Sequence, residues 1–237
     1  MGQCIDEPAG FRPPPSGSQP CYATPAYRST ALRAPLAAPL PFPAGRTETT
    51  GPRFTQEHFP PTPDLSRLDG KEAQGQRILV AGTVTDEDGS PMPGTMIELW
   101  QANAAGRYDH PADRHDAPLD PNFHGAGRVF SDADGKYRFL SVRPGAYPWH
   151  NHDNAWRPSH IHFSLFGAGF AQRLITQMYF EGDPLLAFDP IFHSVPDRKA
   201  RERLVARFDI ALTEPERAMG YRFDIVLRGR LATPMEF

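Results

Sequence analysis

The sequence has 237 residues, 22% of them charged, and a formal net charge of −3. This length can bury a sizeable core within a single domain. The small acidic charge does not favour nucleic acid or an anionic membrane as a partner, and no apolar run approaches the roughly 20 residues that span a bilayer.

The N-terminal region bears on where the protein works. Residues 1–6 show no basic and apolar secretory leader. Cys4 and Cys21 are the two cysteines of the chain, and they do not make a disulfide framework. We therefore expect a cytoplasmic location.

Proline dominates the start of the chain, with ten of the 27 prolines in residues 1–45. Because proline lacks a backbone donor, we expect neither a helix nor a central strand there. The stretch is either a disordered tail or an extended arm. Its aromatic and leucine side chains favour an arm laid on a surface, such as that of a partner, over residues 20–45. We assign residues 1–75 to this arm and 76–237 to the folded domain.

The folded domain shows short apolar stretches bounded by turn residues. The predicted strands are 78–84, 95–100, 128–130, 137–142, 159–166, 174–180 and 221–227. Residues 86–89 are a turn, and 132–135 are predicted as the turn of a hairpin. Short strands at this spacing predict a mainly β fold, an antiparallel β-sandwich.

One helix and two long connections complete the prediction. The helix covers 197–208, where Leu204 and Phe208 lie four apart and Asp197 can pair with Arg201. The connections 102–127 and 144–158 are too long for turns, and loops of that length are usually functional or disordered. They are rich in aromatic, histidine and charged residues, so we expect them to be active-site loops.

Two histidines mark the strand predicted at 159–166. Successive side chains of a strand point to opposite faces, so His160 and His162 share one face while Ile161 and Phe163 point into the core. Two imidazoles on one rigid face suit a metal ion, although a half-exposed strand can also carry histidines without a ligand role. Two further histidines precede the strand and could supply a third or fourth ligand: His150 and His152.

Several motifs resemble those of intradiol ring-cleaving dioxygenases. The most specific are segments 99–108, 144–149 and 156–162, and the similarity continues at 23–27, 48–52, 174–184 and 221–229. The resemblance implies a non-haem Fe(III) centre, one per chain, with O2 as co-substrate. It is strongest to family members that cleave protocatechuate to 3-carboxy-cis,cis-muconate, and it implies a homologous α subunit as partner in an α/β hetero-oligomer.

The resemblance also implies a ligand set. The four ligands would be Tyr108, Tyr147, His160 and His162. Tyr108 and His162 would be equatorial, and Tyr147, which the diol displaces, would be axial with His160. Phenolate is a hard anionic ligand that suits Fe(III). Ionising a free tyrosine at pH 7 requires lowering its pKa by about three units, on the order of 4 kcal/mol, which a bound cation can supply.

Further roles follow from the same resemblance. Arg157 and Gln177 would lie around the ligands, with Arg157 stabilising negative charge. Asp113 would bind Tyr147 after its release. The residues implied to line the substrate pocket are Tyr27, Trp149, His150 and Ile191. At His150 the family usually has an arginine near the substrate carboxylate, so this position departs from the pattern.

Two other functions compete with the dioxygenase. Segments 82–94 and 131–139 also resemble transthyretin-like and carboxypeptidase-regulatory-like β-sandwich modules, which do not catalyse. Those modules do not need the two tyrosines and the His-x-His pair. A zinc hydrolase is disfavoured because no carboxylate base lies at a recognisable spacing. With four ligands placed, the remaining histidines are expected not to bind metal: His110, His115, His124, His150 and His152.

Overall fold

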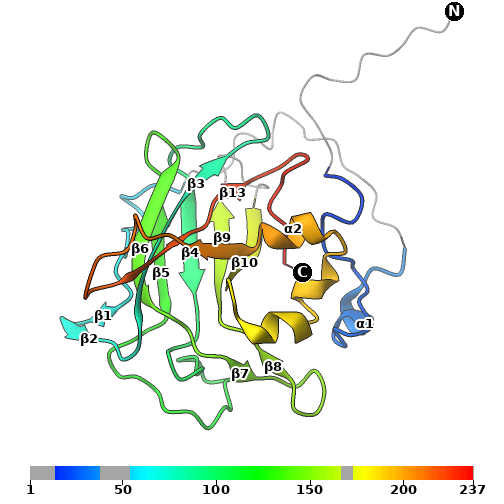
Figure 1. Ribbon diagram of the computed structural model, residues 1–237, viewed down its shortest axis with the longest axis horizontal. Coiled ribbons are helices and arrows are strands. Elements are labelled where there is room, and N and C mark those ends of the chain that lie inside the picture. The colour runs from blue at the N-terminus through cyan, green and yellow to red at the C-terminus, as the bar shows by residue number, and fades with distance from the viewer. Residues whose placement is uncertain (1–13, 38–53, 167–172, 237) are drawn as a thin grey trace, which may run out of the picture.

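The computed structural model describes residues 14–37, 54–166 and 173–236, and the described chain is mainly β, as predicted (Figure 1). The strands that form one continuous network are β3 (Arg77–Thr85), β4 (Met96–Trp100), β5 (Ala126–Phe130), β6 (Lys136–Val142), β9 (His160–Phe166), β10 (Arg173–Phe180), β11 (Val205–Phe208), β12 (Met219–Arg222) and β13 (Ile225–Val226). Two small hairpins lie apart from it: β1 (Arg67–Leu68) with β2 (Lys71–Glu72), and β7 (Tyr147–Pro148) with β8 (Trp156–Arg157).

The network folds into two layers that share a core. One layer runs in the order β5-β4-β9-β10 and the other contains β6, β3, β12 and β11. Phe163 of β9 packs against Phe139 of β6, with ring centroids 6.0 Å apart. Strand β11 joins the layers, because its first half pairs with β10 and its second half with β12.

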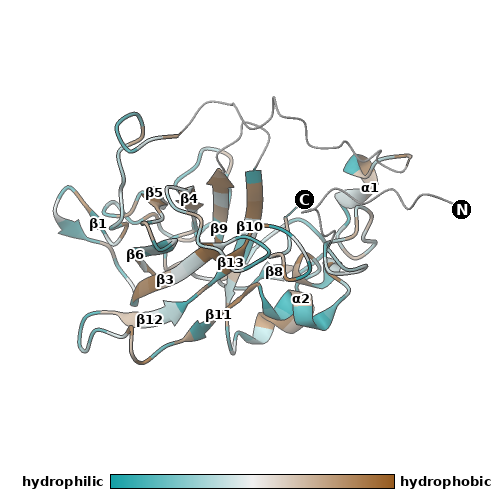
Figure 2. Cartoon of the chain, turned by 90° about the horizontal axis from the view of Figure 1, so that it is seen from above, coloured by the Kyte–Doolittle hydropathy of each residue, from teal (hydrophilic) through white to brown (hydrophobic). Residues whose placement is uncertain are grey.

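Alternation along the central strands decides which side chains enter the core. Ile161 and Phe163 of β9 are fully buried among the apolar side chains of the neighbouring strands. Figure 2 shows the resulting hydrophobic colouring on β9 and β10, in contrast to the hydrophilic α2 (Arg198–Glu202) at the surface. His160 and His162, which alternate with Ile161 and Phe163 along β9, therefore face away from this core.

The strand pairing differs from the prediction in two respects. Not every pair is antiparallel, since β10–β11, β3–β12 and β3–β13 are parallel. The turn at 132–135 exists, but it does not close a hairpin, because β5 pairs with β4 and β6 pairs with β3. The turn instead carries the chain from one layer to the other, which local turn chemistry does not distinguish from a hairpin.

The predicted helix 197–208 is wrong over its second half. Helix α2 ends at Glu202, and Val205–Phe208 is strand β11. The open edges of β10 and β12 offer backbone partners there, which outweigh the helical spacing of Leu204 and Phe208. Asp197 does not pair with Arg201; it accepts hydrogen bonds from the backbone at the helix start, while Arg201 donates to the Val195 carbonyl at 2.6 Å.

The N-terminal arm contains a short helix, contrary to the prediction made from its prolines. Helix α1 (Thr30–Arg33) forms one turn in the proline-free stretch between Pro25 and Pro35. The described part of the arm, 14–37, is laid on its own chain. Cys21 N donates to Ser194 O at 2.9 Å, and Arg28 N donates to Asn151 Oδ1 at 2.9 Å.

The division at residue 75 stays a prediction. Within the predicted arm, Thr62 N donates to Arg128 O and Leu65 N to Leu140 O, both at 2.8 Å, so residues 62–65 pair with the sandwich. Cys4 lies outside the described residues. No helix in the described ranges is long and apolar enough to cross a membrane.

Candidate metal centre

The site begins on the outer face of β9. Antiparallel pairing aligns Trp100 of β4, His162 of β9 and Gln177 of β10 in one row across three strands. In the next row His160 faces Tyr179. The two imidazole centroids lie 4.9 Å apart, so the His-x-His spacing places both rings side by side.

Tyr147 reaches these histidines from the second long loop. The hairpin β7–β8 gives that loop its own structure and pairs Tyr147 with Arg157. The Tyr147 Oη lies 3.2 Å from His160 Nε2. The second long loop, which was predicted to be functional, therefore brings the Tyr147 hydroxyl into contact with the His160 imidazole of β9.

Tyr108 arrives from the first long loop, which crosses the second at two glycines. Gly106 has φ +81°, and a Cβ on it would collide with the Ala146 carbonyl; a Cβ on Gly145 would meet the backbone of the first loop. Gly145 N donates to Asn103 O at 2.9 Å across this crossing. The close approach brings the rings of Tyr108 and Tyr147 to 5.4 Å.

Both imidazoles are held through Nδ1. His160 Nδ1 contacts Pro158 O at 2.7 Å, and His162 Nδ1 contacts Glu236 Oε2 at 3.1 Å. Trp100 stacks on the His162 ring, 4.8 Å between centroids and 4° from parallel. A carbonyl or an ionised carboxylate can only accept, so each Nδ1 donates, and in a neutral ring Nε2 is then the nitrogen that carries the lone pair.

The electrostatics of the pocket fit a cation. Burial, and then the neighbouring Tyr147, hold the pKa of Tyr108 well above its usual value, and burial also raises the pKa of Tyr147. Burial, with the charge of Arg157, holds the pKa of His160 well below its usual value, so its imidazole is neutral. The buried Tyr108 Oη makes no hydrogen bond with the described residues. A neutral His160 imidazole, and phenols that only a bound cation would ionise, suit a hard metal ion.

A metal ion at this site would need the tyrosines as ligands. In the described part of the chain, no group of three or more His, Cys, Asp or Glu side chains is arranged to hold a metal ion. Two histidines and two tyrosines are thus the set that the geometry offers, and it is the set implied by the resemblance.

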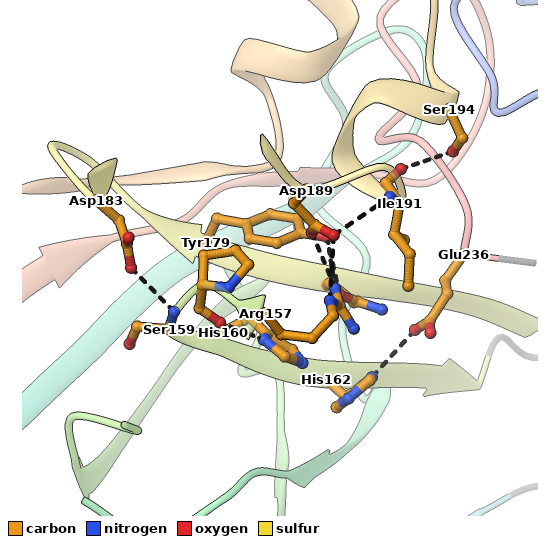
Figure 3. Close-up of polar contacts among 12 residues, drawn as sticks. Arg157, Ser159, His160, His162, Tyr179, Asp183, Asp189, Ile191, Ser194 and Glu236 are labelled. Atoms are coloured by element: carbon orange, nitrogen blue, oxygen red, sulfur yellow. Dashed lines mark hydrogen bonds and ion pairs between the residues drawn. The ribbon is translucent and has the colours of Figure 1, made fainter. Parts of the chain in front are cut away.

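Arg157 is the buried charge behind the ligands (Figure 3). Its guanidinium contacts both carboxylate oxygens of Asp189, at 3.2 and 3.1 Å, and donates to Gln177 Oε1 at 2.5 Å and Tyr179 Oη at 3.1 Å. Burial lowers the pKa of Arg157, but Tyr179 and Asp189 outweigh it, so Arg157 stays charged. A charged guanidinium fixed in this way can stabilise negative charge at the adjacent phenols.

An open hollow of about 1120 Å³ lies between the two long loops and includes Tyr108 and Tyr147 in its wall. Trp149 and His150 also line it. The histidines expected not to bind metal are all at this hollow: His110, His115, His124, His150 and His152. His160 and His162 are not among the residues that line it.

The other predicted residues are distributed around the centre. Tyr27 packs its ring on Trp149, 5.5 Å between centroids, but it does not line the hollow. Ile191 also lies outside it and donates its N–H to Asp189 Oδ1 at 3.3 Å. Asp113 accepts from Tyr108 N at 2.7 Å, so it fixes the Tyr108 backbone here rather than contacting Tyr147.

Four residues of the site were not identified from the sequence. Trp100 stands in a motif used for the resemblance, and its aromatic type at the strand end was an available signal. Tyr179 also stands in such a motif, within 174–184, whereas Asp189 and Glu236 gave no signal, because their partners lie 32 and 74 residues away. Burial tends to raise the pKa of Glu236, and contacts with His162, Gln177 and Arg157 outweigh it, so the carboxyl is ionised.

Comparison with known proteins places these motifs in a family. A model of the dioxygenase family matches residues 49–229, and one of the N-terminal region of the protocatechuate 3,4-dioxygenase beta subunit matches 11–44. The protocatechuate 3,4-dioxygenase beta chain of Burkholderia cepacia is 54% identical over 98% of this chain and 100% of its own length. The alpha chain from that organism is 32% identical over 66% of this chain and 75% of its own.

A solved structure agrees with the sequence comparisons. The dioxygenase domain of a dioxygenase carbohydrate-binding fusion from Streptomyces sp. SirexAA-E superposes with a TM-score of 0.53 at 26% identity. The match covers 76% of this chain and 94% of that domain. The fold comparison and the sequence comparison therefore both match dioxygenases.

Proposed function

The chain belongs to the intradiol ring-cleaving dioxygenases, and from this premise we propose that its substrate is protocatechuate. The ring would open between its two hydroxylated carbons with incorporation of both atoms of O2, giving 3-carboxy-cis,cis-muconate in aromatic compound degradation, the beta-ketoadipate pathway. The near full-length identity to a protein named for this substrate supports the choice.

The four converging side chains carry the proposal. Tyr108, Tyr147, His160 and His162 would hold one non-haem Fe(III) per chain. The orphaned Tyr108 Oη and the two imidazoles, each held through its Nδ1, support this set. When bound, Fe(III) would keep the phenols ionised and withdraw electron density from the diol, which prepares the ring carbon for O2.

The residues of the chain would manage protons and charge. Tyr147 Oη would take up a proton from a hydroxyl of the incoming diol, since it lies at the rim of the hollow and at His160. Arg157, held by Asp189, would stabilise the resulting negative charge, with Gln177 positioning the guanidinium. Asp113 would receive the Tyr147 hydroxyl if that ring swings outward.

Four side chains would shape the diol pocket. Trp149, Tyr27 and Ile191 would shield the ring from water. His150, exposed at the hollow, would bind the substrate carboxylate where the family usually has an arginine. A cytoplasmic location and pairing with a homologous α subunit complete the proposal, the latter supported by similarity to both chains from B. cepacia.

The metal content of the purified protein tests the site. We expect one iron per chain and a red-brown colour from tyrosinate-to-Fe(III) charge transfer. His162→Ala should lose iron and colour while its circular dichroism is retained, whereas His124→Ala, an exposed histidine of the hollow, should keep both. Stoichiometric zinc without iron in active protein would reject the proposal.

A further inference from the structure

The His162 imidazole is fixed by two residues from distant parts of the chain. Trp100 covers one face of the ring. Figure 3 shows the Glu236 carboxylate at the ring edge, where it meets Nδ1 at 3.1 Å. The side chains of both partners in this contact are largely buried, 12% exposed for His162 and 20% for Glu236. Stacking alone fits the ring equally well after a half-turn about Cβ–Cγ, which would exchange Nδ1 with a carbon, whereas the carboxylate contact requires Nδ1 at this edge.

We propose that Glu236 is a positioning residue of the metal centre, which makes the C-terminal tail, residues 231–236, part of the site. This inference rests on the iron centre proposed above. A carboxylate that accepts the Nδ1 proton selects the tautomer whose Nε2 is unprotonated, orients the ring and increases the basicity of that nitrogen.

The tail is docked by contacts with β13, β10, the N-terminal arm and Arg203, so the position of the carboxylate is built into the fold. Thr233 N donates to Val226 O, and Thr176 Oγ1 donates to Pro234 O at 2.7 Å. Met235 N donates to Gln19 Oε1 at 2.9 Å, and Glu236 N donates to Ile175 O at 2.7 Å. The last two bonds bracket the glutamate between the N-terminal arm and β10.

His160 offers a contrast within the same centre. Its Nδ1 partner is the Pro158 carbonyl, two residues away on the same segment, which no side-chain substitution removes. The orientation of His162, by contrast, depends on a side chain 74 residues away. Substitution of Glu236 therefore perturbs one ligand and leaves the other three in place.

Release of iron to a chelator tests the proposal without measuring turnover. The iron-loaded full-length protein, with any partner chain that copurifies, is mixed with excess EDTA, and decay of the visible absorption is followed. We expect Glu236→Ala to release iron about 10- to 100-fold faster than the wild type. Glu236→Gln should fall between them, because its amide oxygen still accepts the Nδ1 proton without the charge.

A surface carboxylate provides the matched control. Glu202 forms an exposed i,i+4 ion pair with Arg198 on α2, so Glu202→Gln should release iron at the wild-type rate. Wild-type release rates in both Glu236 variants would overturn the proposal. If Glu236→Ala fails to fold, the rate in Glu236→Gln decides alone. A wild-type protein without iron would instead reject the function proposed above, so the two failures are distinguishable.

Discussion

At the scale of single residues, the site combines groups that burial keeps neutral. The pKa of each phenol lies above its usual value and that of His160 lies below, because the pocket excludes water. In a pocket without a cation, the phenols would therefore remain protonated. Arg157 does not change this outcome, since its charge is engaged by Asp189. We therefore predict that a bound cation, rather than the protein alone, ionises these phenols.

Tyr147 is the phenol best placed for proton transfer. Tyr147→Phe removes the Oη at His160 but preserves the ring, so we expect part of the iron to remain bound and kcat to fall on the order of 10²-fold. Tyr22→Phe, on the exposed arm, controls for loss of a hydroxyl elsewhere. Iron analysis and steady-state kinetics check both variants, and a wild-type kcat in Tyr147→Phe would contradict the role.

We expect His150 to set how well the pocket accepts a substrate carboxylate. A guanidinium carries its charge permanently and binds a carboxylate through two donors, which an imidazole does not. His150→Arg should therefore strengthen the binding of protocatechuate at pH 8 by roughly 1 kcal/mol and leave the affinity for uncharged catechol unchanged. Steady-state kinetics of both substrates on the wild type and the variant check this, and an equal effect on the two substrates would show that another group binds the carboxylate.

At the scale of elements, two long connections become a rigid support because they cross. The first loop is held to the second by the bond from Gly145 to Asn103, and the second contains the hairpin β7–β8. Tyr108 and Tyr147 come from different loops, so their approach depends on the absence of side chains at the crossing. Loop length and composition marked these segments as functional, and the glycines explain how they hold the two tyrosines together.

Gly106→Ala tests the crossing. The added Cβ would collide with the Ala146 carbonyl in a backbone conformation of φ +81°. We expect a loss of about 1–3 kcal/mol in the free energy of unfolding and a lower iron content. Gly89 has almost the same φ, +82°, but open space around it, so Gly89→Ala measures the conformational cost alone. Urea unfolding and metal analysis compare the pair, and equal effects in both would argue against a role for the crossing.

At the scale of the whole molecule, the hollow is open and the arm leaves apolar side chains exposed. Leu32 and Leu36 on the arm are almost fully exposed, at 94% and 106%. Both lie in the segment matched by the beta-subunit N-terminal model. An exposed apolar surface beside an open site is typical of an interface.

We therefore expect the chain to require a homologous partner subunit. Expressed alone, it should aggregate or show low activity, and coexpression with its α-type relative should give a defined hetero-oligomer with full activity. Sedimentation velocity and activity on the same fractions check this. A stable, fully active monomer would refute the requirement.

The sequence by itself determined the features that depend on neighbouring residues. Alternation puts His160 and His162 on one face, turn residues delimit the strands, and the motifs identify the family. Only the tertiary structure decided which strands pair, that 205–208 is a strand, and that Asp189 and Glu236 hold Arg157 and His162. The physical reason is the range of the interactions: side-chain direction follows from the local backbone, whereas sheet edges and buried ion pairs depend on segments that folding alone brings together.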